Sequence, residues 1–170
     1  MNRYKTFGQR LGAGIVDGIV FLPLELIDEM IPAHVSQSIL WVIFHNALIF
    51  LYYVYLHGKY GQTIGKRVLN VKVVLNNDEA SPIGFKKAFI RDSIWIGLVF
   101  IEILLMLLGY ADNLGGQSLI VTFTLGWSIA ELVTMLFNKK RRAVHDLLAG
   151  SVVIDVTKYT ELEKKLMSES

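Results

Sequence analysis

Four acidic residues lie within or beside long apolar segments of this chain: Asp17, Glu25, Glu102 and Glu131. A carboxylate at the centre of a bilayer costs about 2.5–3.5 kcal/mol or more unless it is paired or hydrated. A rise of about 1.5 Å per helical residue, counted from the basic end of each segment, places Asp17 at a depth of ~12 Å, Glu131 at ~10 Å and Glu102 at ~15 Å. Similar depths predict that these three carboxyls converge inside a helical bundle, where they could bind a cation or a proton.

Asp17 is the strongest of these candidates for an ion-binding or proton-binding residue. Gly14 and Gly18 flank it on the same apolar segment, and small residues leave space for water, an ion or a second helix. A group that gains and loses charge during transport must have a pKa that responds to its surroundings.

The same acids also have a structural interpretation. Each could be protonated, or could pair with His45, Asn46 or a hydroxyl group inside the bundle. Glu25 lies near the end of its apolar segment and is followed by two further acids, so we expect it to be solvated.

The elements that must position these acids are four apolar segments, at residues 7–30, 39–57, 93–109 and 118–137. Each falls within the range of about 17–25 helical residues that cross a hydrocarbon core. A hydrophobic content of 53% and a mean hydropathy of +0.46 are too high for a soluble domain of this length. The sequence therefore predicts an all-α membrane domain over residues 1–157, followed by a charged cytoplasmic tail at 158–170.

The basic residues predict how these segments cross the membrane. All seventeen lysines and arginines lie within residues 3–10, 59–91 and 139–165, and the short loops at 32–38 and 111–117 contain none. Lys and Arg are retained on the cytoplasmic side. We therefore expect four transmembrane helices with both termini and the long middle loop in the cytoplasm. This topology accounts for the basic residues without a nucleic-acid partner.

The middle loop is predicted to be structured. Residues 68–75 and 151–156 are rich in branched side chains and are expected to pair as a small cytoplasmic two-stranded β element. Ser81 and Pro82 are typical of a helix N-cap followed by a first-turn proline. Residues 83–92 then predict an interfacial amphipathic helix whose polar face contains Lys86, Lys87 and Arg91.

Arg10 is expected to pair with an acid other than Asp17. The two residues share a helical face, but the rise between them is about 10 Å. An arginine near the membrane boundary extends its guanidinium toward the interface. Asp146, just beyond the fourth segment, is the best candidate for its partner.

Three separated motifs resemble the RDD family, which is named for one arginine and two aspartates. Here these are Arg10, Asp17 and Asp146, the last of them within RRAVHDLLAG at 141–150. The run GQTIGKR at 61–67 is similar to the family's G-x-T-x-G-K pattern before a strand. The motif residues that we single out as supporting the site are Gly65, Lys66, Arg142 and His145. The resemblance implies a multi-pass protein of a bacterial cell (inner) membrane. Transport, including cation/proton exchange, has been suggested for some members.

Other kinds of chemistry find no support in the sequence. The absence of cysteine excludes thiol catalysis and thiolate metal sites. The run at 61–67 is one residue too short for a phosphate-binding loop, and Arg67 stands where Ser or Thr would hold magnesium. The four histidines are dispersed without ligand spacing, so the sequence predicts no metal site, no cofactor and no enzymatic activity.

Two functions remain open. The first is a small membrane protein involved in transport, with monovalent cation/proton exchange as its specific form. Because four helices offer little room for a translocation path, we expect a homo-oligomer or a complex with another membrane protein in the lipid bilayer. The alternative is a non-transporting adaptor that regulates another membrane protein.

Overall fold

The computed structural model of the chain describes residues 3–36, 38–109 and 114–169. Along these residues the elements are, in order, α1 (Phe7–Met30), α2 (Ala33–Ser36), α3 (Ile39–Tyr60), α4 (Ile64–Val68), β1 (Val71–Leu75), α5 (Gly84–Leu107), α6 (Leu114–Phe137), α7 (Val144–Ala149), β2 (Ser151–Asp155) and α8 (Val156–Glu169). The prediction of a mostly helical chain with a small two-stranded sheet is confirmed.

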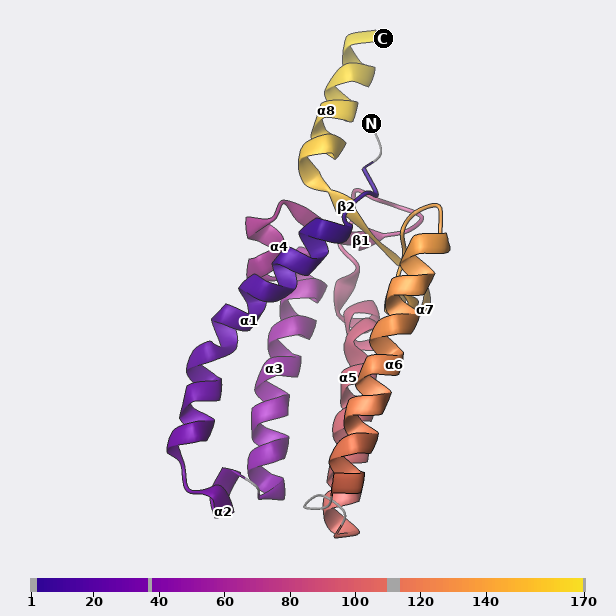
Figure 1. The fold of residues 1–170 in the computed structure, drawn as a ribbon. Coiled ribbons are helices and arrows are strands. Elements are labelled where there is room, and N and C mark those ends of the chain that lie inside the picture. The colour runs from indigo at the N-terminus through magenta and orange to yellow at the C-terminus, as the bar shows by residue number, and fades with distance from the viewer. Residues whose placement is uncertain (1–2, 37, 110–113, 170) are drawn as a thin grey trace.

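The long helices α1, α3, α5 and α6 extend from the same side of the sheet (Figure 1). The short helices α4 and α7 lie beside the two strands, and we call this part of the molecule the sheet end. Helix α2 lies at the opposite end, which we call the far end, and α8 projects away from the long helices. Polar side chains on one long helix can therefore contact those on another at either end of the molecule.

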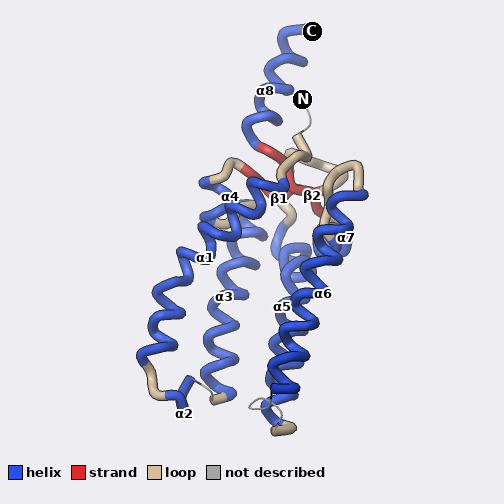
Figure 2. Tube along the Cα trace, in the orientation of Figure 1, coloured by secondary structure: helices blue, strands red, loops and turns tan. Residues whose placement is uncertain are grey.

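The two strands pair antiparallel, with Val73 opposite Val153 in the middle of the register (Figure 2). Buried side chains lie on both faces of this pair. One group comprises Val71, Val73, Ile83, Ala88 and Val153, and the other comprises Val74, Val152 and Ile154. The predicted strand pair is confirmed, although its first strand begins later than expected. Residues 68–70 end α4 and form a turn in which Asn70 has a φ of 54°.

The outer surfaces of the long helices are rich in exposed large apolar side chains. Leu11 and Ile15 on α1, Leu40 on α3, and Phe100 on α5 are examples. Among the described residues, α3 is the helix long and apolar enough to cross a membrane, whereas Val121–Phe137 of α6 is apolar but shorter. Exposed apolar surface of this kind is stable in lipid or against another protein rather than in water.

Helix α5 is continuous where the sequence predicted two elements. The expected interfacial helix at 83–92 is the first part of α5, because Ala88 packs into the sheet core and holds these turns in line with the rest of the helix. The expected N-cap at Ser81 is wrong, since its hydroxyl donates to Asp78 within the preceding turn. Arg91, placed on a solvated polar face by the sequence, is only 5% exposed.

Candidate functional site at the sheet end

Asp146 is a fully buried carboxylate at the start of α7 that is shared by two arginines. Its Oδ2 lies 2.7 Å from Nη1 of Arg10 on α1, and its Oδ1 lies 3.1 Å from Nη2 of Arg91 on α5. The backbone N–H of Ala143 donates to Oδ2 at 3.1 Å, and the Ser151 hydroxyl lies 3.3 Å from Oδ1. The expected Arg10–Asp146 pair is confirmed, and the carboxylate joins α1 and α5 to α7 and β2.

These partners keep Asp146 ionised despite its burial. Burial alone raises the pKa of a carboxyl group because it disfavours the charged form. Arg10 and Arg91, together with the Ala143 hydrogen bond, outweigh burial and hold the pKa of Asp146 well below its usual range.

Arg142 fixes the segment that contains Asp146. Its Nε donates to the Ser151 carbonyl at 2.8 Å, and its Nη2 donates to the Asp146 carbonyl at 3.0 Å. The guanidinium thus joins α7 to the first residue of β2. We infer a positioning role for this residue within the RRAVHD motif.

Asp17 accepts three hydrogen bonds from the 61–67 motif and α3. The donors are the Thr63 hydroxyl at 2.7 Å, the Gly65 backbone N–H at 2.8 Å and the Tyr52 hydroxyl at 2.8 Å. The Asp17 side chain is almost completely buried. Its carboxylate therefore docks α4 onto α1, and binding of a transported ion by Asp17 stays a prediction.

The GQTIGKR run forms the turn and helix that present these donors. Gly61 ends α3 with a φ of 69°, in the left-handed region that favours glycine. The Thr63 side chain caps α4 by accepting from the Lys66 N–H at 3.2 Å. A Cβ on Gly65 would lie 2.1 Å from the Ala13 carbonyl oxygen, so α1 and α4 approach too closely for any other residue.

The two glycines beside Asp17 do not share this packing. A Cβ added to Gly14 or Gly18 would meet no described atom within 4 Å. The space expected beside Asp17 is therefore on a different side of α1 from its hydrogen-bond donors. These glycines leave an open face on the helix.

His57 on α3 lies between a lysine and a carboxylate. Its Nε2 is 2.9 Å from Lys66 Nζ, and its Nδ1 is 2.8 Å from Asp92 Oδ2. An ammonium group can only donate and a carboxylate can only accept, so Nε2 accepts from Lys66 and Nδ1–H donates to Asp92. Burial, followed by the charge of Arg91, lowers the pKa of Lys66 to about 8, although Asp17 and Asp92 raise it.

His145 on α7 has an equivalent arrangement. Its Nε2 is 2.8 Å from Arg91 Nη2, and its Nδ1 is 2.7 Å from Glu131 Oε2. By the same reasoning, Nε2 accepts from the guanidinium and Nδ1–H donates to the carboxylate. The backbone N–H of His145 also donates to Glu131 at 3.2 Å. Two imidazoles thus each connect a cation to a carboxylate.

Both imidazoles line one cavity of about 390 Å³ between α3, α5 and α6. Arg91 and Asp92 form part of its polar wall, and Trp95 and Trp127 belong to its apolar lining. A cavity bordered by linked donors and acceptors can exchange protons with the groups behind them. We therefore regard the two histidines and their partners as the candidate site.

The three intramembrane acids of the sequence analysis belong to separate sets of partners. Asp17 bonds to α4, Glu131 bonds to His145, and Glu102 lies within electrostatic range of His45 at the far end. Their expected convergence is wrong, because Asp17 and Glu131 bond to different donors at the sheet end and Glu102 lies near His45 instead. The Asn46 side-chain amide donates to the Val42 carbonyl in its own helix at 2.9 Å, and among the described residues no acid is bonded to it.

Several residues of the site were missed by sequence reasoning. The sequence analysis places Arg91 on the polar face of an interfacial helix, gives Asp92 no role, and treats His57 only as one of four dispersed histidines. The signal that could have identified them is their position, because all three lie where a polar segment meets an apolar one. Tyr52 and Thr63 have no such signal, since only the fold brings their hydroxyls to Asp17.

We predict that Gly65→Ala destabilises the protein by about 3 kcal/mol or more, because the new methyl group overpacks the α1–α4 contact and displaces the N–H that Asp17 accepts. Thermal unfolding of the purified protein in detergent measures the loss. Gly8→Ala is the matched control, since a Cβ there meets nothing within 4 Å. Equal melting temperatures for the two variants would contradict this account of the motif.

Comparison with known proteins agrees with the motifs. Residues 4–150 match the model of the RDD family, whose members are generally membrane-associated. The uncharacterized protein YckC of Bacillus subtilis (strain 168) is 29% identical over 161 residues, which cover 92% of this chain and 89% of that protein. No solved structure matches the chain. Because the matched residues include Arg10, Asp17 and Asp146 and cover most of the sequence, the chain belongs to the RDD family.

Proposed function

We propose that this protein crosses a bacterial cell membrane four times through α1, α3, α5 and α6, with the sheet end and both termini in the cytoplasm. Two observations support this topology. The four helices extend from one side of the sheet and expose apolar side chains (Figure 1). The basic residues also lie in segments at the sheet end, whereas residues 11–58 and 92–138 contain no Lys or Arg.

We propose further that the protein takes part in transport, in the form of monovalent cation/proton exchange. The observation that carries this proposal is the pair of imidazoles, one buried (His57) and one partly buried (His145), each held between a cation and a carboxylate at a shared cavity. Perturbed titratable groups in a cavity are typical of functional sites. No enzymatic step is part of this proposal.

The Lys66–His57–Asp92 chain has the composition of a proton relay. The lowered pKa of Lys66, about 8, reduces the cost of releasing its proton near neutral pH. A shift along the chain moves one proton from Lys66 to His57 Nε2, while the Nδ1 proton passes to Asp92. Asp92 lines the cavity, and the reverse shift restores the original tautomer of His57.

A non-transporting adaptor is the second candidate, and the open glycine face of α1 favours it. A Cβ added to Gly14 or Gly18 would meet no described atom of another segment within 4 Å, and small residues at this spacing allow a second helix to approach closely. The same face would serve a homo-oligomeric transporter. This surface therefore does not distinguish the two functions. They differ in whether the protein moves ions across the membrane.

We predict that cysteines introduced singly at Ser36 and Asn113 react with an impermeant thiol reagent added outside cells, and that cysteines at Asn76 and Ser168 do not. The chain has no cysteine of its own, so each label reports one position. Asn113 falls outside the described residues. External labelling at Asn76 would overturn the four-span topology.

We predict that the purified protein in proteoliposomes moves Na⁺, K⁺ or Li⁺ in response to a pH gradient, and that Asp92→Asn reduces this flux at least about tenfold, since an amide cannot take up the relayed proton. Because the pKa of Lys66 is about 8, flux should change most steeply near that pH. Lys66→Arg keeps a positive charge but does not titrate in this range, so the steep change should disappear.

Lys86→Arg is the matched control, because Lys86 is an exposed lysine on α5. Its flux should equal that of the unmodified protein. Unchanged flux in Asp92→Asn would exclude the relay. Absence of flux with all three cations would instead favour the adaptor.

A further inference from the structure

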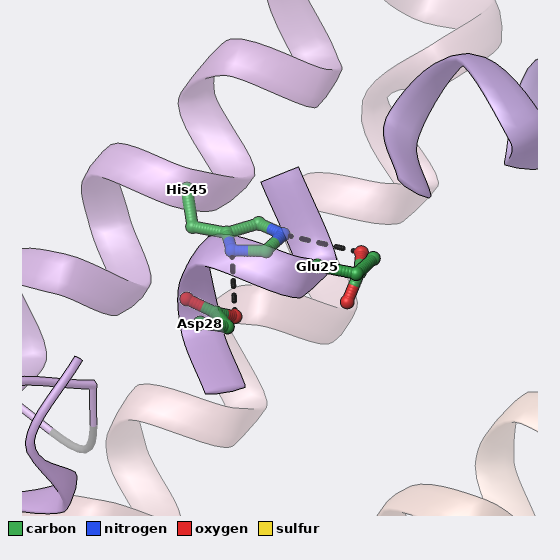
Figure 3. Close-up of side chains that lie close together, drawn as sticks. All are labelled: Glu25, Asp28 and His45. Carbon is green, nitrogen blue, oxygen red and sulfur yellow. Dashed lines mark ion pairs between the residues drawn. The ribbon is translucent and has the colours of Figure 1, made fainter. Parts of the chain in front are cut away.

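Glu25, Asp28 and His45 form a cluster (Figure 3). It joins the last part of α1 to the first part of α3, next to α2 at the far end (Figure 1). Glu25 and Asp28 are three residues apart on α1, and both face the imidazole of His45 on α3. The three side chains offer ligand atoms that all lie within 4.8 Å of one another. His45 is 9% exposed, whereas Glu25 opens to the surface.

Asp28 determines which nitrogen of His45 is protonated. Its Oδ2 lies 2.9 Å from His45 Nδ1, and its Oδ1 accepts a hydrogen bond from the indole N–H of Trp41. A carboxylate accepts only, so Nδ1 carries the proton of the neutral imidazole. In the neutral imidazole, which is the form that binds metals, Nε2 then holds a lone pair.

That lone pair faces another electron-pair donor. His45 Nε2 lies 3.5 Å from Glu25 Oε1. This separation is longer than an ordinary N–H···O hydrogen bond of about 2.7–3.2 Å. It is close to the spacing of about 3.4 Å between two ligands of a tetrahedral zinc ion with bonds of about 2.1 Å. The geometry is that of two ligands with space for a cation between them.

The charge of the far end provides a second, independent observation. The long stretches 11–58 and 92–138, which include the far ends of α1, α3 and α5, contain no Lys or Arg. Glu102 on α5 lies within electrostatic range of His45 and adds a third carboxylate to the surroundings. The acidic charge around His45 therefore has no Lys or Arg from these stretches to balance it.

We propose that His45 Nε2 and Glu25 bind a divalent transition metal of the zinc class, while Asp28 orients the imidazole. A metal-bound histidine commonly donates its other N–H to a carboxylate, as His45 does to Asp28. An imidazole ligand favours zinc over magnesium or calcium, which prefer sites made of oxygen ligands alone. Water completes the coordination on the open side of Glu25. This site goes beyond the proposed transport function and does not rest on it.

The proposal departs from the sequence-based expectation of no metal site. That expectation came from the dispersed histidines, which show no ligand spacing along the chain. The cluster instead combines one histidine with acids from another helix, 20 and 17 positions earlier in the sequence. Only the packing of α1 beside α3 brings them together.

Titration of the purified full-length protein with ZnCl₂ tests the site, with Co²⁺ absorption as a second readout of the ligands. The Trp41 indole contacts Asp28, so its fluorescence should respond to metal in a Trp95→Phe/Trp127→Phe background. We expect one Zn²⁺ per chain and no competition from Mg²⁺. His45→Gln and Glu25→Gln should each weaken binding at least about tenfold, and Asp28→Asn should weaken it through the lost orientation of His45.

Glu29→Gln is the matched control, since Glu29 is a neighbouring acid on α1 outside the cluster. The Zn²⁺ affinity of this variant should equal that of the unmodified protein. Circular dichroism of each variant shows whether weaker Zn²⁺ binding comes from the loss of a ligand or from the loss of the folded structure. Failure of the unmodified protein to bind Zn²⁺, or equal affinity in the folded His45→Gln variant, would overturn the proposal.

Discussion

The buried carboxylate of Asp146 is the interaction on which the sheet end depends. A charge removed from water must be paired and hydrogen-bonded, and loss of one partner from such a pair typically costs about 3–5 kcal/mol. Asp146 meets this requirement with Arg10 from α1, Arg91 from α5 and donors from its own segment. Two long helices far apart in the sequence are therefore fixed relative to α7 and the strands.

Asp17 imposes the same constraint seven residues beyond Arg10 along α1. Its donors come from Tyr52 on α3 and from Thr63 and Gly65 in the segment leading into β1. Helix α1 is consequently held at the sheet end through polar contacts, whereas much of its remaining surface is apolar and exposed. This division suits a protein whose polar end lies in water and whose helices lie in lipid. It also brings His57 and His145 to the same cavity, because their cationic partners belong to the segments that these carboxylates hold in place.

Much of the fold could be predicted from local patterns. The apolar segments predict the long helices, and the runs of branched residues predict the strand pair. The cost of an unpaired charge identifies Asp146 as the partner of Arg10. The partners of Asp17 could not be predicted, since two hydroxyls and a backbone N–H have no charge or periodicity that marks them. Arg91 was misplaced because a helical pattern shows which side of α5 is polar, but not that α7 covers it. The Glu25–Asp28–His45 cluster likewise depends on how α1 packs beside α3.

The ionisation of Asp146 tests the central claim most directly. Carbon-13 NMR of the aspartate carboxyl groups, with the Asp146 signal assigned by its loss in Asp146→Asn, can follow this group over about pH 4 to pH 8. Because its pKa is held below the usual range, we expect the signal to stay at its carboxylate position throughout. The stability that this lowered pKa contributes should be present above about pH 4 and decrease as the pH falls further. A titration of the Asp146 signal with a midpoint above about pH 4 would contradict the account.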